Sequence, residues 1–214
     1  DKTLEDFLKD KNPSVRKRAA LASGRIGNED AIPMLTELLA SDKSIEVQQM
    51  AAFAIGEIES SNGADAILKV LGNFKNHPHI RASAIEAAGK IAAANADAES
   101  SKHLGKAILD NLEFEARRRS APDGNVILLG VTAVLRTKPE NSEEIIKEFL
   151  TYSDWRIRAD TLNTLARLRT KNSNDKAKEL LQKDESPIVR ANAARVLGAA
   201  EDKSSLDLLI KHGT

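Results

Sequence analysis

The chain has 214 residues, 41% of them hydrophobic, and its 32 basic and 32 acidic side chains give a formal net charge of zero. This composition predicts a folded protein and excludes a global electrostatic field that would attract nucleic acid or an anionic membrane. The sequence has no cysteine, which excludes disulfides and thiol chemistry, and no apolar run reaches the roughly 18 residues that a membrane span needs.

A helical motif recurs along the chain. Each copy has an aliphatic residue at position 0, usually followed by Arg, with small or apolar residues at positions 4, 5, 7 and 8 and a small residue at position 9. In chain order, position 0 is Val15, Val47, Ile80, Gly124, Ile157 and Val189, and the copy at Gly124 fits poorly. The position 9 residues are 32, 33, 44, 33 and 32 residues apart. This period predicts a repeat protein with one insertion.

Each copy has the apolar spacing of an amphipathic helix. A shorter stretch with helical spacing precedes each one, at residues 4–8, 31–39, 64–71, 104–112, 145–150 and 176–181. The turns between them contain cap residues and prolines, as in Asn12-Pro13. Position 9 is Gly in four copies, at a cost of up to about 1 kcal/mol within a helix. We therefore expect hairpins of two helices that stack closely on one another.

The motif resembles the HEAT repeat, particularly the short bacterial variety named after phycobilisome lyases, over essentially the whole chain. In that family a turn Asp lies six residues before an Arg of the second helix, and the two form a hydrogen-bonded ladder along the solenoid. The matching pairs are Asp10 with Arg16 and Asp184 with Arg190, whereas Asp42 is followed by Gln48. Arg81 and Arg158 have Lys75 and Tyr152 in place of the turn Asp, so in these repeats the ladder is either broken or made by a different residue, such as Asp154. We interpret both residue types as structural.

The resemblance implies an all-α, right-handed α-solenoid, an α-α superhelix of about six HEAT-type hairpins in a single domain. The predicted repeats are approximately 1–27, 28–60, 61–96, 97–138, 139–171 and 172–200, with a partial repeat at 201–214. Neither end has a polar cap, so we expect the natural protein to continue beyond Thr214.

The resemblance also implies that the second helices line a concave surface. Positions 2, 3, 6 and 10 are left free by the apolar pattern and form one strip across neighbouring helices. The predicted partner-binding residues on this strip are Arg18, Leu21, Met50, Phe53, Glu57, Glu86, Lys90, Asp160, Asn163, Arg167, Asn192 and Arg195. Leu21, Met50 and Phe53 form an apolar cluster suited to a protein or peptide. Burial of these three between adjacent helices is the alternative.

Two features of the fourth repeat are open to more than one interpretation. The same register places Ile127 and Val134 on the strip, where we expect them to be core residues. The insertion, at residues 113–123, contains Arg117, Arg118 and Arg119. It is either a basic protrusion for an anionic ligand or an extended first helix with cations near its C-terminal end, where the helix dipole favours them. We favour the extended helix.

Signatures of enzymes are missing from the sequence. It has no phosphate-binding glycine loop, no nucleophile elbow and no HExxH helix. His77 and His79 flank a proline and have no carboxylate at helical spacing, so we predict no metal site. The HEAT-type deoxyhypusine hydroxylases resemble the chain in architecture, but their adjacent His-Glu pairs are missing here, and we expect that activity to be absent.

We therefore predict a non-enzymatic scaffold that binds a protein or peptide on its concave face as a monomer. We expect it to use no cofactor, nucleic acid or membrane insertion, in either the cytoplasm or the periplasm. One alternative is a substrate-presenting domain of a larger enzyme such as a peptidyl-prolyl isomerase. The others are a HEAT-like DNA glycosylase, for which Trp155 and Asp160 are suggestive, and a phycobilin lyase. We expect Trp155 to pack between repeats.

Overall fold

The computed structural model describes residues 3–118 and 122–212, and in these ranges the chain forms α-helices and short 3-10 turns without strands. The first helices of the hairpins are α1 (Leu4–Leu8), α3 (Ile32–Ser41), α5 (Ala64–Leu71), α7 (Glu99–Arg117), α9 (Ser142–Ile146) and α11 (Asn174–Lys183). The second helices are α2 (Pro13–Ile26), α4 (Ile45–Ile58), α6 (Pro78–Ala94), α8 (Gly124–Thr137), α10 (Trp155–Leu168) and α12 (Pro187–Ala199). The helix α13 (Leu206–His212) follows them.

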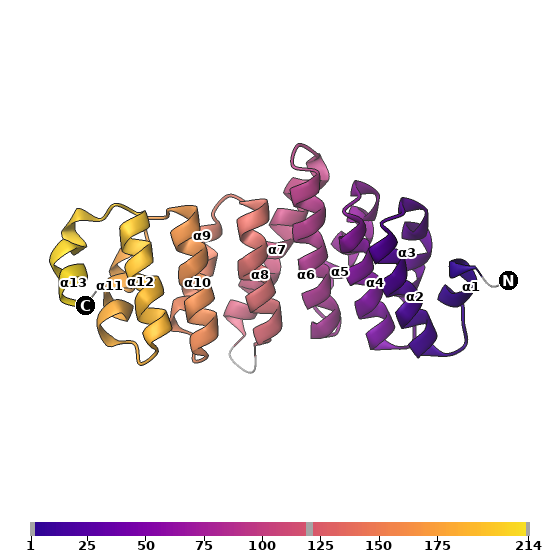
Figure 1. Cartoon of the computed structure of the whole chain (residues 1–214), viewed down its shortest axis with the longest axis horizontal. Helices are drawn as coiled ribbons and strands as arrows, with labels where there is room; N and C mark the ends of the chain where they lie inside the picture. The colour runs from indigo at the N-terminus through magenta and orange to yellow at the C-terminus, as the bar shows by residue number, and fades with distance from the viewer. Residues whose placement is uncertain (1–2, 119–121, 213–214) are drawn as a thin grey trace.

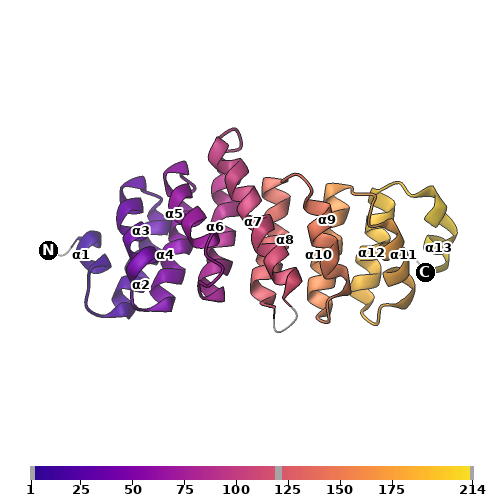
Figure 2. The same ribbon diagram turned by 180° about the vertical axis from the view of Figure 1, so that it is seen from behind.

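The helices form two layers along one axis. Figure 1 shows the second helices side by side in a front layer, and each contacts the next one along the array. The first helices form the back layer (Figure 2), and α1 and α13 lie at opposite ends of the array. The predicted all-α solenoid of helical hairpins is confirmed.

Side-chain caps set where the front helices begin. Asn12, Ser44 and Asp154 each accept a hydrogen bond from a backbone N–H in the first turn of the helix that follows. His77 caps α6 in the same way, through its ring nitrogen Nδ1. Position 0 of the repeat is therefore the third residue of each front helix, and the same apolar face of every helix points into the core.

Glycine at position 9 brings neighbouring front helices into backbone contact. A Cβ atom built on Gly24 would lie 2.8 Å from the Cα of Ala54, and one on Gly56 would lie 2.6 Å from the Cα of Ala87. These distances are shorter than any real carbon contact. The close approach explains why the repeat accepts a residue that weakens a helix.

The predicted register of the fourth repeat is wrong by two residues. Val126 is the third residue of α8, and Ala133 contacts Gly89, as Ala54 and Ala87 contact the glycines before them. Position 0 is therefore Val126, not Gly124. With this register the strip residues of α8 become Leu129, Thr132 and Arg136. Ile127 and Val134 take positions 1 and 8 and are fully buried, as expected for core residues. The mismatch arose because Gly124 is the first residue of the helix, ahead of the motif.

The insertion lengthens α7. This helix has 19 residues, compared with 8 in α5, the first helix of the preceding hairpin. Arg117 forms an ion pair with Glu113, and Arg118 with Glu115, so the acidic residues nearby offset these two cations. Arg119 lies outside the described residues. The extended-helix interpretation fits these contacts better than a basic protrusion does.

The arginines at position 1 connect successive repeats. Arg16 donates to the backbone carbonyl of Asp10 and, with Nε and an Nη, to both carboxylate oxygens of Asp42 in the next repeat at 2.6 and 2.8 Å. Arg158 makes the same pair of bonds to Asp184. The carboxylate partner therefore comes from the following turn. The expectation that Asp154 serves Arg158 is wrong, since Asp154 caps α10.

We predict that Asp42 makes stability depend on acid pH. The hydrogen bond from Arg16 lowers the pKa of this carboxyl below its ordinary value of 3.8. Because the folded pKa lies below the unfolded one, the stabilisation is complete above about pH 4 and is lost as the pH falls through the folded value. The substitution Asp42→Asn is expected to lower the free energy of unfolding by about 1.5–3 kcal/mol at pH 7. Urea titrations of both proteins between pH 7 and 2 should show this gap closing in acid, and a constant gap would contradict the assignment.

Candidate functional site

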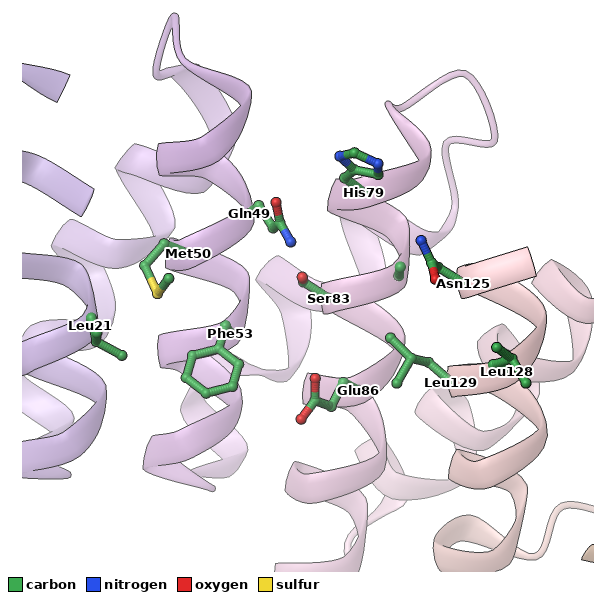
Figure 3. A pocket seen from close by; sticks show the side chains of 11 residues that line it. Leu21, Gln49, Met50, Phe53, His79, Ser83, Glu86, Asn125, Leu128 and Leu129 are labelled. Atoms are coloured by element: carbon green, nitrogen blue, oxygen red, sulfur yellow. The ribbon is translucent and has the colours of Figure 1, made fainter. Parts of the chain in front are cut away.

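A groove crosses four consecutive front helices, α2, α4, α6 and α8. It encloses about 480 Å³ and is lined by Leu21, Gln49, Met50, Phe53, His79, Ala82, Ser83, Glu86, Asn125, Leu128 and Leu129. Figure 3 shows these side chains on the exposed face of the front layer. Four of the residues predicted from the sequence line the groove: Leu21, Met50, Phe53 and Glu86.

The apolar part of the groove comes from three helices. Leu21, Met50 and Phe53 are all partly exposed, so packing of adjacent helices does not bury them fully. Leu128 and Leu129 of α8 face them across α6 (Figure 3). These two leucines are not among the predicted strip residues, because the predicted register of the fourth repeat is displaced by two residues. A motif beginning at Val126 places Leu128 and Leu129 at positions 2 and 3.

A charged cluster lies beside the groove. The ammonium of Lys90 donates to Glu57 at 2.5 Å and to Glu86 at 2.7 Å, and it lies 4.7 Å from the centre of the Phe53 ring. Burial lowers the pKa of Lys90, but the hydrogen bonds that it donates to both carboxylates outweigh this effect and leave its pKa above the ordinary value. Four residues of the predicted strip therefore form one cluster that joins α4 to α6: Phe53, Glu57, Glu86 and Lys90.

Polar side chains form one rim of the groove. His79 and Asn125 are the second residues of α6 and α8, and Gln49 is the fifth residue of α4. Figure 3 shows the three side chains at one side of the apolar floor. These amides and the imidazole make no side-chain hydrogen bond to another described residue of the front layer. They are therefore able to bond to an incoming backbone.

The remaining strip residues lie outside the groove. Arg18 is exposed on α2, and Asp160, Asn163 and Arg167 lie on α10. On α12, Asn192 donates to the backbone carbonyl of Ala159 at 3.0 Å and accepts a longer bond of 3.4 Å from Arg195. Partial burial raises the pKa of Asp160. A role in binding for these residues remains a prediction.

Trp155 does not pack between repeats as expected. It is 38% exposed at the first position of α10, where the guanidinium of Arg156 lies 5.6 Å from its ring centre.

The histidines do not converge on a ligand set for a metal ion. His77 and His79 contact each other edge to face at the start of α6, and His103 faces Glu99 on the surface of α7. Among residues 3–118 and 122–212, no three His, Asp or Glu side chains form a cluster suited to a metal. In the same part of the chain, no helix has the length and apolarity that crossing a bilayer requires.

The chain is similar to a curated enzyme. Deoxyhypusine hydroxylase-B from Oryza sativa subsp. japonica is 28% identical over 214 residues, which cover 96% of this chain and 63% of the relative. This chain therefore spans less than two thirds of that protein. The similarity contradicts our expectation of a non-enzymatic scaffold, which rested on missing motifs. It also overturns the expectation that set this enzyme class aside for lack of adjacent His-Glu pairs.

Solved structures share the fold. The complex of CpcE and CpcF of phycocyanin lyase from Nostoc sp. PCC7120 matches with a TM-score of 0.65 at 16% identity, covering 97% of this chain and 80% of that one. An engineered protein matches with a TM-score of 0.63 at 18% identity, covering 92% and 95%. At these identities the likeness extends to the architecture alone.

A family model described as HEAT repeats matches residues 2–48, 32–122, 113–198 and 142–213. Together these matches include nearly every residue, and they agree with the stacked hairpins and the position 9 contacts described above. The chain belongs to the HEAT-repeat family.

Proposed function

We propose that this chain acts in an enzyme related to deoxyhypusine hydroxylase, and that its groove binds a protein or peptide substrate of that enzyme. The similarity to the rice hydroxylase along 96% of the chain supports the enzyme class. We assign no catalytic residue within the described ranges and derive no metal-dependent step, because the histidines and carboxylates there do not converge.

One observation carries the binding role: the groove continues across four helices without a break. Neighbouring helices pack about 8–10 Å apart, and a chain in the polyproline II conformation advances about 3.1 Å per residue with about three residues per turn. A segment in this conformation would therefore point about every third side chain at a new helix. The apolar floor formed by Leu21, Met50, Phe53 and Leu129 provides contact area, and the polar rim offers hydrogen bonds to the backbone of the segment.

A competition assay tests this proposal. The rice relative is given its deoxyhypusine substrate together with increasing amounts of this chain, and hydroxylation is followed by mass spectrometry as the gain of one oxygen atom. We expect the chain either to hydroxylate the substrate itself or to inhibit the relative by sequestering the substrate. In both cases the effect should be lost in the double variant Met50→Glu, Phe53→Glu, because two carboxylates would stand in the apolar floor.

The matched control is the double variant Leu206→Glu, Ile210→Glu, which introduces the same two charges at exposed apolar residues of α13, at the far end of the array. It should behave like the unaltered chain. Circular dichroism would confirm that all variants keep their helical content. The proposal fails if the chain neither turns over nor sequesters the substrate, or if the groove variant and the control act alike.

A further inference from the structure

A hydroxyl without a hydrogen-bond partner among the described residues faces the groove. Ser83 of α6 is only 7% exposed, yet it lines the groove, and its Oγ makes no hydrogen bond to another described residue. Figure 3 shows this oxygen directed into the space between α6 and α4. The Oγ of Ser83 is accessible to solvent through the groove. A ligand group that bonds to Ser83 would replace this solvent contact with a direct hydrogen bond.

Glu86 lies one turn further along α6, on the same face as Ser83. Its Oε1 accepts the bond from Lys90, as Oε1 of Glu57 does, while neither Oε2 atom has a hydrogen bond in the described structure. Two carboxylates therefore share one ammonium, which leaves one negative charge unmatched. Both carboxylates are 31% exposed, and neither forms another ion pair with a described residue. Of the two, only Glu86 lines the groove.

The contacts of Lys90 indicate that this part of the groove favours a cation. Its ammonium is held by carboxylates and lies over the face of Phe53, an arrangement that favours cations through the ring quadrupole. Phe53 and Glu86 of this cluster also line the groove, where Met50 and Leu129 provide apolar walls for an alkyl stem. One free carboxylate oxygen and one hydroxyl act as point acceptors. They suit a compact ammonium better than the planar fork of a guanidinium.

We propose that Ser83, Glu86 and Phe53 form a binding site for one lysine-like side chain of the substrate segment, with its stem along Met50 and Leu129 and its ammonium between Ser83 Oγ and the free oxygen of Glu86. This inference rests on the proposed function in that the side chain belongs to the segment bound in the groove. It goes beyond that function by naming an ammonium side chain as the group that the groove selects, and Ser83, Glu86 and Phe53 as the residues that select it.

Peptide binding measured by calorimetry tests the site without any enzyme activity. The probes are acetylated and amidated decapeptides of alanine with leucine at positions 1, 4 and 10 and lysine at position 7, and the same peptide in reverse order. In matched peptides norleucine or arginine replaces lysine. With the unaltered chain, the better of the two lysine peptides is expected to bind about tenfold more tightly than its norleucine partner, the size of a charge-assisted hydrogen bond. The arginine peptide should fall between them.

Three variants locate the selectivity. Glu86→Gln removes the charge and should abolish the preference for lysine over norleucine, and Ser83→Ala should reduce it. Glu179→Gln makes the same charge change on α11 in the back layer, where the carboxylate pairs with Lys176, and it should leave the preference intact. The inference is overturned if lysine and norleucine peptides bind equally, if no peptide binds, or if Glu179→Gln has the effect of Glu86→Gln.

The two proposals fail separately. Equal binding of lysine and norleucine peptides, together with inhibition of the rice enzyme, rejects the lysine site and leaves the substrate groove standing. Lysine-selective binding without any effect on hydroxylation rejects the enzyme assignment.

Discussion

The substitution Glu115→Gln is expected to lower the free energy of unfolding by about 3–5 kcal/mol. Glu115 accepts a 2.5 Å bond from Arg81, and the two side chains are 0% and 1% exposed. Its other oxygen accepts from the backbone N–H of Asp123 at 2.8 Å. Glutamine keeps the shape but places an amide donor against one of these donors and leaves the Arg81 charge uncompensated in the core. Urea unfolding at neutral pH measures the loss.

The control lies two residues earlier on the same helix. Glu113 pairs with Arg117 on the surface, and Glu113→Gln should change stability by no more than about 0.5 kcal/mol, because exposed pairs contribute little. The double variant Arg81→Met, Glu115→Leu removes both charges and should recover most of the stability, since a well-packed apolar pair replaces a buried ionic one at little cost. If Glu115→Gln lowered the free energy of unfolding as little as Glu113→Gln does, the Arg81–Glu115 pair would be hydrated.

Alanine at the two position 9 glycines Gly56 and Gly198 is expected to act in opposite directions. In Gly56→Ala the new methyl group would lie 2.6 and 2.7 Å from the Cα and Cβ of Ala87, so α4 and α6 must separate. We expect a net loss of about 1–3 kcal/mol, because overpacking outweighs the gain in helix propensity. At Gly198 the methyl group meets nothing within 4 Å, and Gly198→Ala should gain about 0.5–1 kcal/mol.

Thermal unfolding of the two variants and of the unaltered chain measures both changes in stability, the expected loss in Gly56→Ala and the expected gain in Gly198→Ala. Because stability in a repeat array depends on the contacts between neighbouring units, Gly56→Ala should also broaden the transition as the units on either side of α4 and α6 uncouple. If both substitutions stabilised the protein, helix propensity alone would decide the effect of alanine at position 9, and the proposed backbone contact between α4 and α6 would be wrong.

The sequence alone determined the architecture of this protein. Apolar residues at helical spacing, repeated every 32 or 33 residues, can be buried only if hairpins stack, because a single hairpin has no partner for its apolar face. The same periodicity identified Met50 and Phe53, since large apolar residues at positions that the pattern leaves free stand out in a repeat. It failed at Gly124, where the helix begins two residues before the motif, and Leu128 and Leu129 were missed for this reason.

Function was predicted less well than fold. The absence of familiar motifs led to the expectation of a non-enzymatic scaffold, which the similarity to the rice hydroxylase contradicts. Motifs of local sequence are poor guides in a solenoid, because its sites are assembled from side chains about 32 residues apart on successive helices.

The tertiary structure alone decided which partners the polar residues take. Arg16 and Arg158 select carboxylates in the next repeat, and Arg81 turns to the extended helix α7, where Glu115 replaces the missing turn aspartate. Lys90 reaches two helices at once and leaves one carboxylate oxygen of Glu86 facing the groove beside Ser83. Periodicity places a residue on a face of its own helix, but the partner it meets depends on the rise and rotation between repeats. That geometry is set by packing at glycine contacts such as Gly56 with Ala87.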